Sequence, residues 1–353
     1  MSLSKDAKFL EAIENEDIEA VEKFISEGVN VHLNLIGECP LDVALRTFNE
    51  KIVDLLGSAR QMPLMFMQKK MSEAVYSCSR TKSKMLAKHA TLNASTIAGE
   101  PSFLYSAYKN DWKGVAETLI SRGCSLKKEN NSGYALLHLA AKDGAIEWID
   151  ILLKADLGID DYNGLSQTPL QVAAQYGQVK MVQKLIDCGA DILRTENMKS
   201  RASQSTPSPS HSVLHYAAYS KRADVVDVLF ENNPNLDVNR VGRDEKTPLI
   251  IAIENDNLET VKALIRHGAD VNLKINYETP LHLAVRKNNH KMVEVLLSHQ
   301  ANMHQQNKDG MTPISLALEK GFNRVLNLFK VPQKVVSAGR YILTDNQKSY
   351  EKQ

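Results

Sequence analysis

The sequence predicts an all-α protein, a solenoid in which about nine short helical pairs follow one another. The first observation is a recurring phrase: a small or polar residue, proline, leucine, a polar residue, an apolar residue and alanine. The second is the spacing of the closing alanines, at positions 12, 44, 107, 140, 173, 217, 252, 284 and 317; six of the eight gaps are 32 to 35 residues. The third is an apolar stretch with helical spacing after most of these alanines.

The first helix of each unit follows from the recurring phrase itself. Its clearest copies occupy residues 247–252, 279–284 and 312–317, and versions without the proline occupy 135–140 and 212–217. A threonine before the proline can cap the helix, and proline at the first helical position loses nothing because that N–H has no partner inside a helix. The leucine, apolar residue and alanine form a narrow apolar face, which allows two helices to approach closely.

The second helix of each unit follows from apolar pairs spaced three residues apart. The pattern is complete at 181–186 (Met-Val-Gln-Lys-Leu-Ile) and at 292–297 (Met-Val-Glu-Val-Leu-Leu). This spacing places the apolar residues on one helix face. A Gly-Ala-Asp turn follows the second helix at 189–191 and 268–270, where glycine can adopt the left-handed conformation that ends a helix.

These phrases resemble the ankyrin repeat. Thr-Pro-Leu-His-Leu-Ala at 279–284 and Gly-Ala-Asp-Val-Asn at 268–272 match phrases of that family, and the resemblance extends over about residues 4–330. It implies an ankyrin-repeat solenoid of about nine helix–turn–helix units with hairpin loops that project to one side. Because one unit cannot bury its apolar face alone, we expect the stacked units to share a continuous core.

Two irregular gaps divide the chain. We expect two units at 1–59, the first of them a cap, and units three to nine at 101–330. The segment at 60–100 interrupts the stack after the second unit. A Ser/Pro-rich insertion at 199–210 lengthens one hairpin loop, and a polar tail occupies 331–353.

The segment at 60–100 is basic and contains five of the eleven methionines. One interpretation is a single long helix that covers neighbouring units, with one apolar face formed by Leu64, Met67, Met71, Val75, Cys78 and Met85. The alternative is a basic, Met-rich docking surface for a partner protein or an anionic membrane. In that case the second contact comprises Lys69, Lys70, Arg80, Lys82 and Lys84. Aromatic residues are too few to favour nucleic-acid binding.

No catalytic motif is evident, so we expect no enzyme activity, cofactor or metal site. The chain lacks a Gly-rich phosphate loop, a zinc-protease helix and a Gly-x-Ser-x-Gly elbow. His138, His215 and His282 occupy the fourth position of the phrase, where the ankyrin resemblance implies hydrogen bonds to loop backbone and threonine. His211 and His215 are four residues apart, but the sequence shows no third ligand for a metal.

Charge and cysteine content narrow the class of protein. The 43 basic and 42 acidic residues give a net charge of +1, which argues against chain-wide binding to nucleic acid or to a membrane surface. Four scattered cysteines fit a reducing cytosol, and Cys39 stands where other units have the capping threonine. No apolar run reaches the about 18 residues of a membrane helix, and no signal-peptide core is present. We therefore expect a cytoplasmic protein.

The ankyrin resemblance implies that partner proteins bind a concave surface formed by the first helices and the hairpin tips. Tyrosines at the variable positions of that surface are informative, because exposed tyrosine is enriched among interface hot spots. The alternative is that each ring packs along a neighbouring side chain. We assign partner binding to a patch on the middle units: Tyr162, Gln175, Tyr176, Tyr219, Ser220, Glu254, Asn255, Tyr277, Arg286 and Lys287.

Three functions fit these observations. The leading hypothesis is a non-catalytic interaction module that binds one or more partner proteins through the concave surface. A second is an ankyrin-type effector that an intracellular bacterium delivers into the host cytosol to bind a host protein, with the polar tail as a secretion signal. A third is an enzyme whose site forms between the segment at 60–100 and the repeats. The sequence leaves the oligomeric state open.

Overall fold

The computed structural model divides into two compact units. The described residues are 4–31, 39–59, 62–77, 79–89, 103–123, 135–154, 157–195 and 210–330. Unit 1 comprises Met1–Leu136 and Glu147–Leu157, and unit 2 comprises Leu137–Ile146 and Gly158–Gln353. The tail predicted at 331–353 and all but the last residue of the loop insertion predicted at 199–210 lie outside the described residues.

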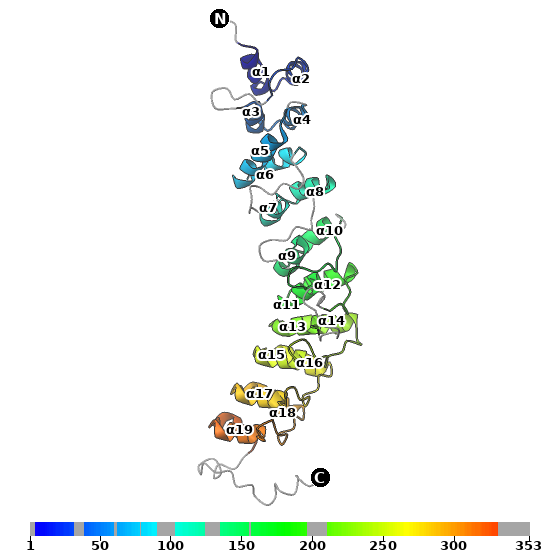
Figure 1. Ribbon diagram of the computed structural model, residues 1–353, viewed down its shortest axis with the longest axis vertical. Coiled ribbons are helices and arrows are strands. Elements are labelled where there is room, and N and C mark those ends of the chain that lie inside the picture. The colour runs from blue at the N-terminus through cyan, green and yellow to red at the C-terminus, as the bar shows by residue number, and fades with distance from the viewer. Residues whose placement is uncertain are drawn as a thin grey trace, which may run out of the picture. The chain divides into compact units, whose positions relative to one another are not determined.

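Within these ranges the helices are short and follow one another in pairs (Figure 1). Unit 1 contains α1 (Lys5–Glu14), α2 (Ile18–Ser26), α3 (Pro40–Thr47), α4 (Glu50–Ser58), α5 (Leu64–Tyr76), α6 (Arg80–Ala87), α7 (Phe103–Lys109), α8 (Lys113–Ser121) and, after its first residue, α10 (Ile146–Leu153). Unit 2 contains, after its first residue, α9 (Leu136–Asp143), then α11 (Pro169–Gln175), α12 (Val179–Asp187), α13 (Val213–Tyr219), α14 (Asp224–Asn232), α15 (Pro248–Glu254), α16 (Leu258–Arg266), α17 (Pro280–Arg286), α18 (His290–Ser298), α19 (Pro313–Glu319) and α20 (Asn323–Leu328). The described residues contain no β-strand, so the predicted all-α class is confirmed.

The first helix of most pairs in unit 2 begins as the recurring phrase predicts. Thr168, Thr247, Thr279 and Thr312 are N-caps, and each side-chain oxygen accepts the backbone N–H three residues later at 3.2–3.3 Å. Proline occupies the first helical position in all four. A cap of this kind contributes about 1 kcal/mol to helix stability, because it satisfies an N–H that has no partner inside the helix.

The helices of unit 2 form two layers. α11 packs on α13, α13 on α15, α15 on α17 and α17 on α19; the second layer runs in the same order from α12 to α20. The closing alanines of the phrase are 0% exposed in this unit: Ala173, Ala217, Ala252, Ala284 and Ala317. A side chain this small allows neighbouring helices of the first layer to approach closely, as the sequence predicted.

The segment predicted as an insertion forms a further helical pair of unit 1. α5 packs on α6 and α7, and α6 packs on α4 and α8. The prediction of one long helix is therefore wrong. Ser77 ends α5 and Ser79 precedes α6, and the turn between them brings the apolar faces of both helices into the core. One signal was available, because Ala74 lies 30 residues after Ala44 and 33 before Ala107.

The methionines of this pair belong to the core. Met62, Met67, Met71 and Met85 are all buried, with exposed fractions of 8%, 1%, 0% and 1%. The methionines therefore do not form a docking surface, since their flexible side chains here fill space between helices; the predicted contact through the basic residues stays a prediction. The side chains of Leu64 and Cys78, which the sequence placed on the same face, lie outside the described residues.

Candidate functional site

A groove on unit 2 collects residues from two neighbouring helices of the first layer and from the hairpins around them. Its volume is about 440 Å³. It is lined by Lys246, Ile250, Glu254, Ile275, Asn276, Glu278, Thr279, Leu283, Arg286, Lys308 and Asp309. Of the residues that the sequence assigned to partner binding, Glu254 and Arg286 line this groove.

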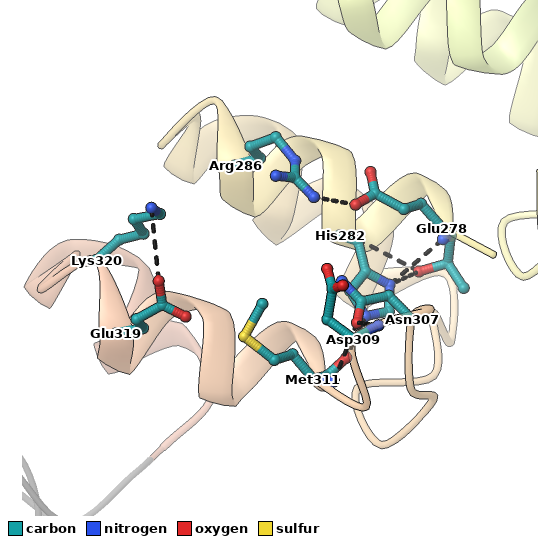
Figure 2. A network of polar contacts seen from close by, with 9 residues as sticks. Glu278, His282, Arg286, Asn307, Asp309, Met311, Glu319 and Lys320 are labelled. Carbon is teal, nitrogen blue, oxygen red and sulfur yellow. Dashed lines mark hydrogen bonds and ion pairs between the residues drawn. The ribbon is translucent and has the colours of Figure 1, made fainter. Parts of the chain in front are cut away.

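Two ion pairs hold four of the six charged side chains of the groove. In each pair, one residue directly precedes the capping threonine and the other ends the first helix, eight positions later. Lys246 Nζ lies 2.8 Å from Glu254 Oε2. Arg286 contacts Glu278 in the same arrangement at the next helical pair of unit 2, as Figure 2 shows.

The two pairs run in opposite directions, because the residue before the capping threonine is a lysine in one unit and a glutamate in the next. Lys308 and Asp309 add one charge of each sign, so the lining holds three cations and three anions. Ile250 and Leu283 contribute apolar surface to the same groove. The groove is therefore nearly neutral, which suits an uncharged side chain of a partner better than a charged one.

Sequence reasoning missed Lys246 and Glu278, because it considered only the hairpin tip and the end of the first helix. The signal that could have found them was present. Residues of opposite charge flank two successive copies of the phrase, at positions 246 and 254 and at positions 278 and 286.

The hairpin between α16 and α17 lines the groove with Ile275, Asn276 and Glu278 and carries an exposed tyrosine, Tyr277, among them in sequence. Two backbone hydrogen bonds of 2.9 Å between Ile275 and Glu278 close a two-residue turn. Asn276 and Tyr277 have φ angles of 51° and 66°, in the left-handed region that favours glycine. Tyr277 is 68% exposed, so burial of its ring does not offset this backbone strain. The hairpin is therefore a candidate contact for a partner.

The other predicted tyrosines divide into two groups. Tyr176 and Tyr219 are 44% and 39% exposed and remain available on the first layer of unit 2. Tyr162 differs from the expectation, because its hydroxyl donates to the carbonyl of Thr195 at 2.8 Å and accepts from Arg194 Nε at 3.1 Å. Its role is to fasten the hairpin in front of α11.

Ser220 does not belong to an accessible surface. It is 4% exposed, and its carbonyl oxygen accepts hydrogen bonds from Asn257 and Thr260, each at 3.1 Å. Its hydroxyl oxygen accepts the N–H of Arg222 at 3.0 Å. The residue ties the turn after α13 to the next pair, so the sequence-based assignment to partner binding is wrong.

The remaining predicted contacts already have partners inside unit 2. Gln175 Oε1 accepts from Gln167 Nε2 at 2.9 Å, which is the uncharged counterpart of the ion pairs in the groove. Lys287 Nζ lies 3.0 Å from Asp256 Oδ2. Asn255 is exposed, and its side chain donates to the carbonyl four residues earlier. Contacts within unit 2 therefore position these side chains before any partner protein binds.

The histidines of the phrase connect one ankyrin-type helical pair to the hairpin of the next pair. Nδ1 of His282 accepts the N–H of Thr279 at 3.3 Å, and Nε2 donates to the carbonyl of Met311 at 3.0 Å (Figure 2). Because an amide donates to one ring nitrogen and a carbonyl accepts from the other, the ring is neutral with its proton on Nε2. Burial lowers the pKa of His282, which favours this neutral form.

His215 and His138 make related contacts. His215 accepts the N–H of Ser212 and donates to the carbonyl of Lys246, both at 3.1 Å. His138 Nε2 donates to the carbonyl of Gln167 at 3.0 Å. Burial lowers the pKa of His215 to about 3 and the pKa of His138 to about 4. The hydrogen bonds to loop backbone that the ankyrin resemblance implied are confirmed for all three histidines. The implied threonine contact is present at His282, and at His215 a serine takes the place of the threonine.

In unit 1 a thiol takes the place of the capping threonine. Cys39 Sγ accepts the N–H of Asp42 at 3.4 Å and donates to Asp42 Oδ2 at 2.9 Å. Lys70 Nζ lies 2.7 Å from Asp42 Oδ1 and 3.0 Å from Glu73 Oε2, so Lys70 ties α5 to α3 and does not belong to an open second contact. Burial raises the pKa of Cys39 to about 11, so the thiol is protonated near neutral pH and is a poor nucleophile.

Among the described residues, no group of three or more histidine, cysteine, aspartate or glutamate side chains could hold a metal ion. No described helix combines the length and the apolar character needed to cross a membrane. The groove itself offers hydrogen-bonding groups, a small apolar surface and an exposed aromatic ring at the hairpin beside it.

Known proteins share this repeat. The family profile described as "Ankyrin repeats (3 copies)" matches residues 103–196, 198–275 and 274–335. The human transient receptor potential cation channel subfamily A member 1 is 23% identical over 303 residues, which are 75% of this chain and 24% of that protein. The putative E3 ubiquitin-protein ligase XBAT31 of Arabidopsis thaliana is 32% identical over 152 residues, which are 38% of this chain and 30% of that protein.

A solved structure has the same fold. The ankyrin repeat domain of human ASB11 matches with a TM-score of 0.54 and 25% identity, over 66% of this chain and 99% of that one. The chain spans no more than about a third of the length of the two curated relatives described above. Ankyrin repeats generally mediate contacts between proteins and are generally non-catalytic. On the family match, the twin helical layers and the shared capping phrase, this chain belongs to the ankyrin-repeat family.

Proposed function

We propose that this chain is a non-catalytic interaction module and that unit 2 binds an extended segment of a partner protein in the groove at α15 and α17. The observation that carries the proposal is a groove of about 440 Å³ with an exposed tyrosine on the hairpin that lines it. Tyr176, which follows α11, and Tyr219, the last residue of α13, are exposed as well. In a family that generally binds proteins, exposed rings beside a groove are suited to hold a partner.

The tyrosines would supply most of the affinity. Complete burial of an aromatic side chain contributes about 1.5–3 kcal/mol, and tyrosine has few rotatable bonds to immobilise. The ring of Tyr176 is already oriented, because Lys142 Nζ lies 5.0 Å from its centroid. Tyr277 is free to cover a bound segment, since two thirds of it is exposed.

The ion pairs would supply specificity more than attraction. A partner carboxylate that approached Arg286 would have to compete with Glu278, and a partner cation that approached Glu254 would have to compete with Lys246. The expected occupant therefore places an uncharged side chain on Ile250 and Leu283. Because no net charge attracts it, its affinity should change little with ionic strength.

A pull-down of the full chain from cell extract, with partners identified by mass spectrometry, tests the proposal. Each partner is then titrated against Tyr277→Ala and against Leu193→Ala, a control that is 64% exposed and outside the groove. We expect at least about tenfold weaker binding for Tyr277→Ala and less than about threefold for the control. If every partner binds both variants as it binds the unchanged chain, the groove is not the site.

We also propose a cytoplasmic location, because both cysteines in the described residues, Cys39 and Cys188, are free thiols. Fractionation of cells that express a tagged chain tests this location. The comparisons provide no observation in favour of a bacterial effector delivered into a host. The described residues provide none for an enzyme site, so neither function is proposed.

A further inference from the structure

The helical pair α5–α6 carries cations that its surroundings do not neutralise. Residues 64–88 contain six lysines and arginines and a single acid, Glu73. Lys70 is bound by Asp42 and Glu73, and Lys88 Nζ lies 2.9 Å from Asp54 Oδ2. The other four form no ion pair among the described residues, and they are named the basic surface: Lys69, Arg80, Lys82 and Lys84.

Three of the four cations, Arg80, Lys82 and Lys84, lie on α6 and are close enough for their fields to add. α6 has eight residues and is therefore about 12 Å long, which is close to the Debye length of about 8–10 Å at physiological salt. Arg80 and Lys84 are four residues apart and share one side of α6. Lys82 lines a recess of about 360 Å³, to which Leu45 and Ala74 add apolar surface.

We infer that the basic surface docks an acidic segment of a partner protein. Lys82 would meet a carboxylate that enters the recess, while Lys69, Arg80 and Lys84 would meet acidic residues on either side of it. The recess is lined by three cations, Arg46, Lys70 and Lys82, against two acids, Asp42 and Glu73, so its lining has an excess of one positive charge. This inference concerns unit 1 and does not depend on the groove of unit 2.

Two other anionic partners fit the surface less well. A membrane-binding helix needs apolar side chains that enter the lipid, but Met67, Met71 and Met85 are buried in the core. Single-stranded nucleic acid needs exposed rings on which bases stack. On α5 the ring of Phe66 is half-buried, and Lys70 Nζ lies 5.6 Å from its centroid. A peptide carboxylate needs neither feature.

The test uses the full chain and four probes. These are a fluorescent dodecapeptide of alternating Glu and Ser, its Gln-Ser counterpart, vesicles of phosphatidylcholine and phosphatidylserine in equal parts, and an oligothymidylate. One variant carries Lys69→Gln, Arg80→Gln, Lys82→Gln and Lys84→Gln. A control carries Lys180→Gln, Lys221→Gln, Lys291→Gln and Arg324→Gln, which changes the net charge equally at exposed positions of unit 2.

We expect the Glu-Ser peptide to bind in 0.1 M NaCl, the Gln-Ser peptide to fail, and the first variant to lose about thirtyfold in affinity, or about 2 kcal/mol at 1.4 kcal/mol per tenfold. The control should lose less than about threefold. Equal losses for both variants would mean that bulk charge decides, which overturns the inference. Tighter binding to the vesicles or to the oligonucleotide than to the peptide also overturns it, and so does no binding of the peptide.

A second measurement does not depend on whether the variant folds. Peptide binding to the unchanged chain must weaken steeply between about 0.1 M and 1 M NaCl, because the Debye length falls from about 10 Å to about 3 Å. An affinity that stays constant over this range would refute an electrostatic docking surface. Circular dichroism of both variants establishes that helix content is kept; lysine, arginine and glutamine have similar helix propensities.

Discussion

Replacing His215, at the fourth position of the phrase, by glutamine should remove its contribution to the loss of folding stability in acid. The substitution should change the stability near neutral pH little. The chain itself contains the precedent, because Gln171 occupies that position in the unit of α11. Its Oε1 accepts the N–H of Thr168 at 3.0 Å, and its Nε2 donates to the carbonyl of Arg194 at 2.8 Å. These are the two bonds that His215 makes to Ser212 and to the next hairpin. Glutamine makes them without a titratable group.

The magnitude follows from the pKa of His215, which burial lowers from 6.5 to about 3. Between these two values the unfolded chain binds a proton at this residue and the folded chain does not. The stabilisation from the neutral ring is therefore complete above the unfolded pKa and is lost progressively as the pH falls below it. At pH 5, about 1.5 pH units below that pKa, the loss is about 2 kcal/mol, at 1.36 kcal/mol per unit.

Urea unfolding at about pH 7.5 and about pH 5, followed by circular dichroism, measures this loss. At the higher pH, His215→Gln should unfold within about 1 kcal/mol of the unchanged chain, since both bonds persist. On acidification it should lose about 2 kcal/mol less than the unchanged chain. His304→Gln, at an exposed loop position, controls for the chemical change. If His215→Gln and the unchanged chain lose equal stability between the two pH values, protonation of His215 does not cause the loss and the prediction is refuted.

Three further predictions concern a strained backbone position, the packing of a buried alanine and a side-chain hydrogen bond. Phe48 ends α3 with a φ of 58° and is 52% exposed, so Phe48→Gly should raise the free energy of unfolding by about 1 kcal/mol; an unchanged urea midpoint would contradict this. Ala252→Leu overfills a position that is 0% exposed and should cost about 1–3 kcal/mol, seen as a lower thermal midpoint. Trp148 Nε1 donates to Asp111 Oδ1 at 2.8 Å, so Trp148→Phe should lower the free energy of unfolding by about 1 kcal/mol. In a chain that already carries Asp111→Ala, the same substitution should lower it measurably less, because the acceptor is gone.

The helices of unit 2 could be predicted because their start signals are local. Thr279 caps its helix through a residue three positions away, so the phrase contains the whole cap. The pair α5–α6 has no such signal, since Pro63 precedes α5 without a side-chain cap. The apolar residues of both helices lie inward only because the chain turns between them. A period of about 32 residues, marked there by Ala74 alone, was too weak to predict that turn.

The groove could be predicted only in part, because its properties depend on which residues meet across units. Tyr162 and Tyr277 both lie in hairpins that precede a capping threonine, yet one is held by Arg194 and the other is exposed. Tyr162 lies six residues before Thr168 and Tyr277 only two before Thr279, and the sequence alone did not show which of these positions meets the next hairpin. The repeat predicted where a surface would form, but not which of its side chains are already satisfied.

The two candidate surfaces differ in how their charges are balanced, and ionic strength can therefore separate them. In the groove Lys246 and Arg286 each form an ion pair with an acid of the groove, so screening changes little when a neutral side chain binds. On the basic surface none of the four cations has an ion-pair partner among the described residues, so screening removes much of their attraction for an acidic segment. A partner that resists 1 M NaCl and is lost with Tyr277→Ala binds the groove. A partner that is lost with salt and with the Lys69, Arg80, Lys82 and Lys84 substitutions binds α5–α6. One that salt releases but that both variants retain would contradict both assignments, since its attraction would come from charges that neither surface contains.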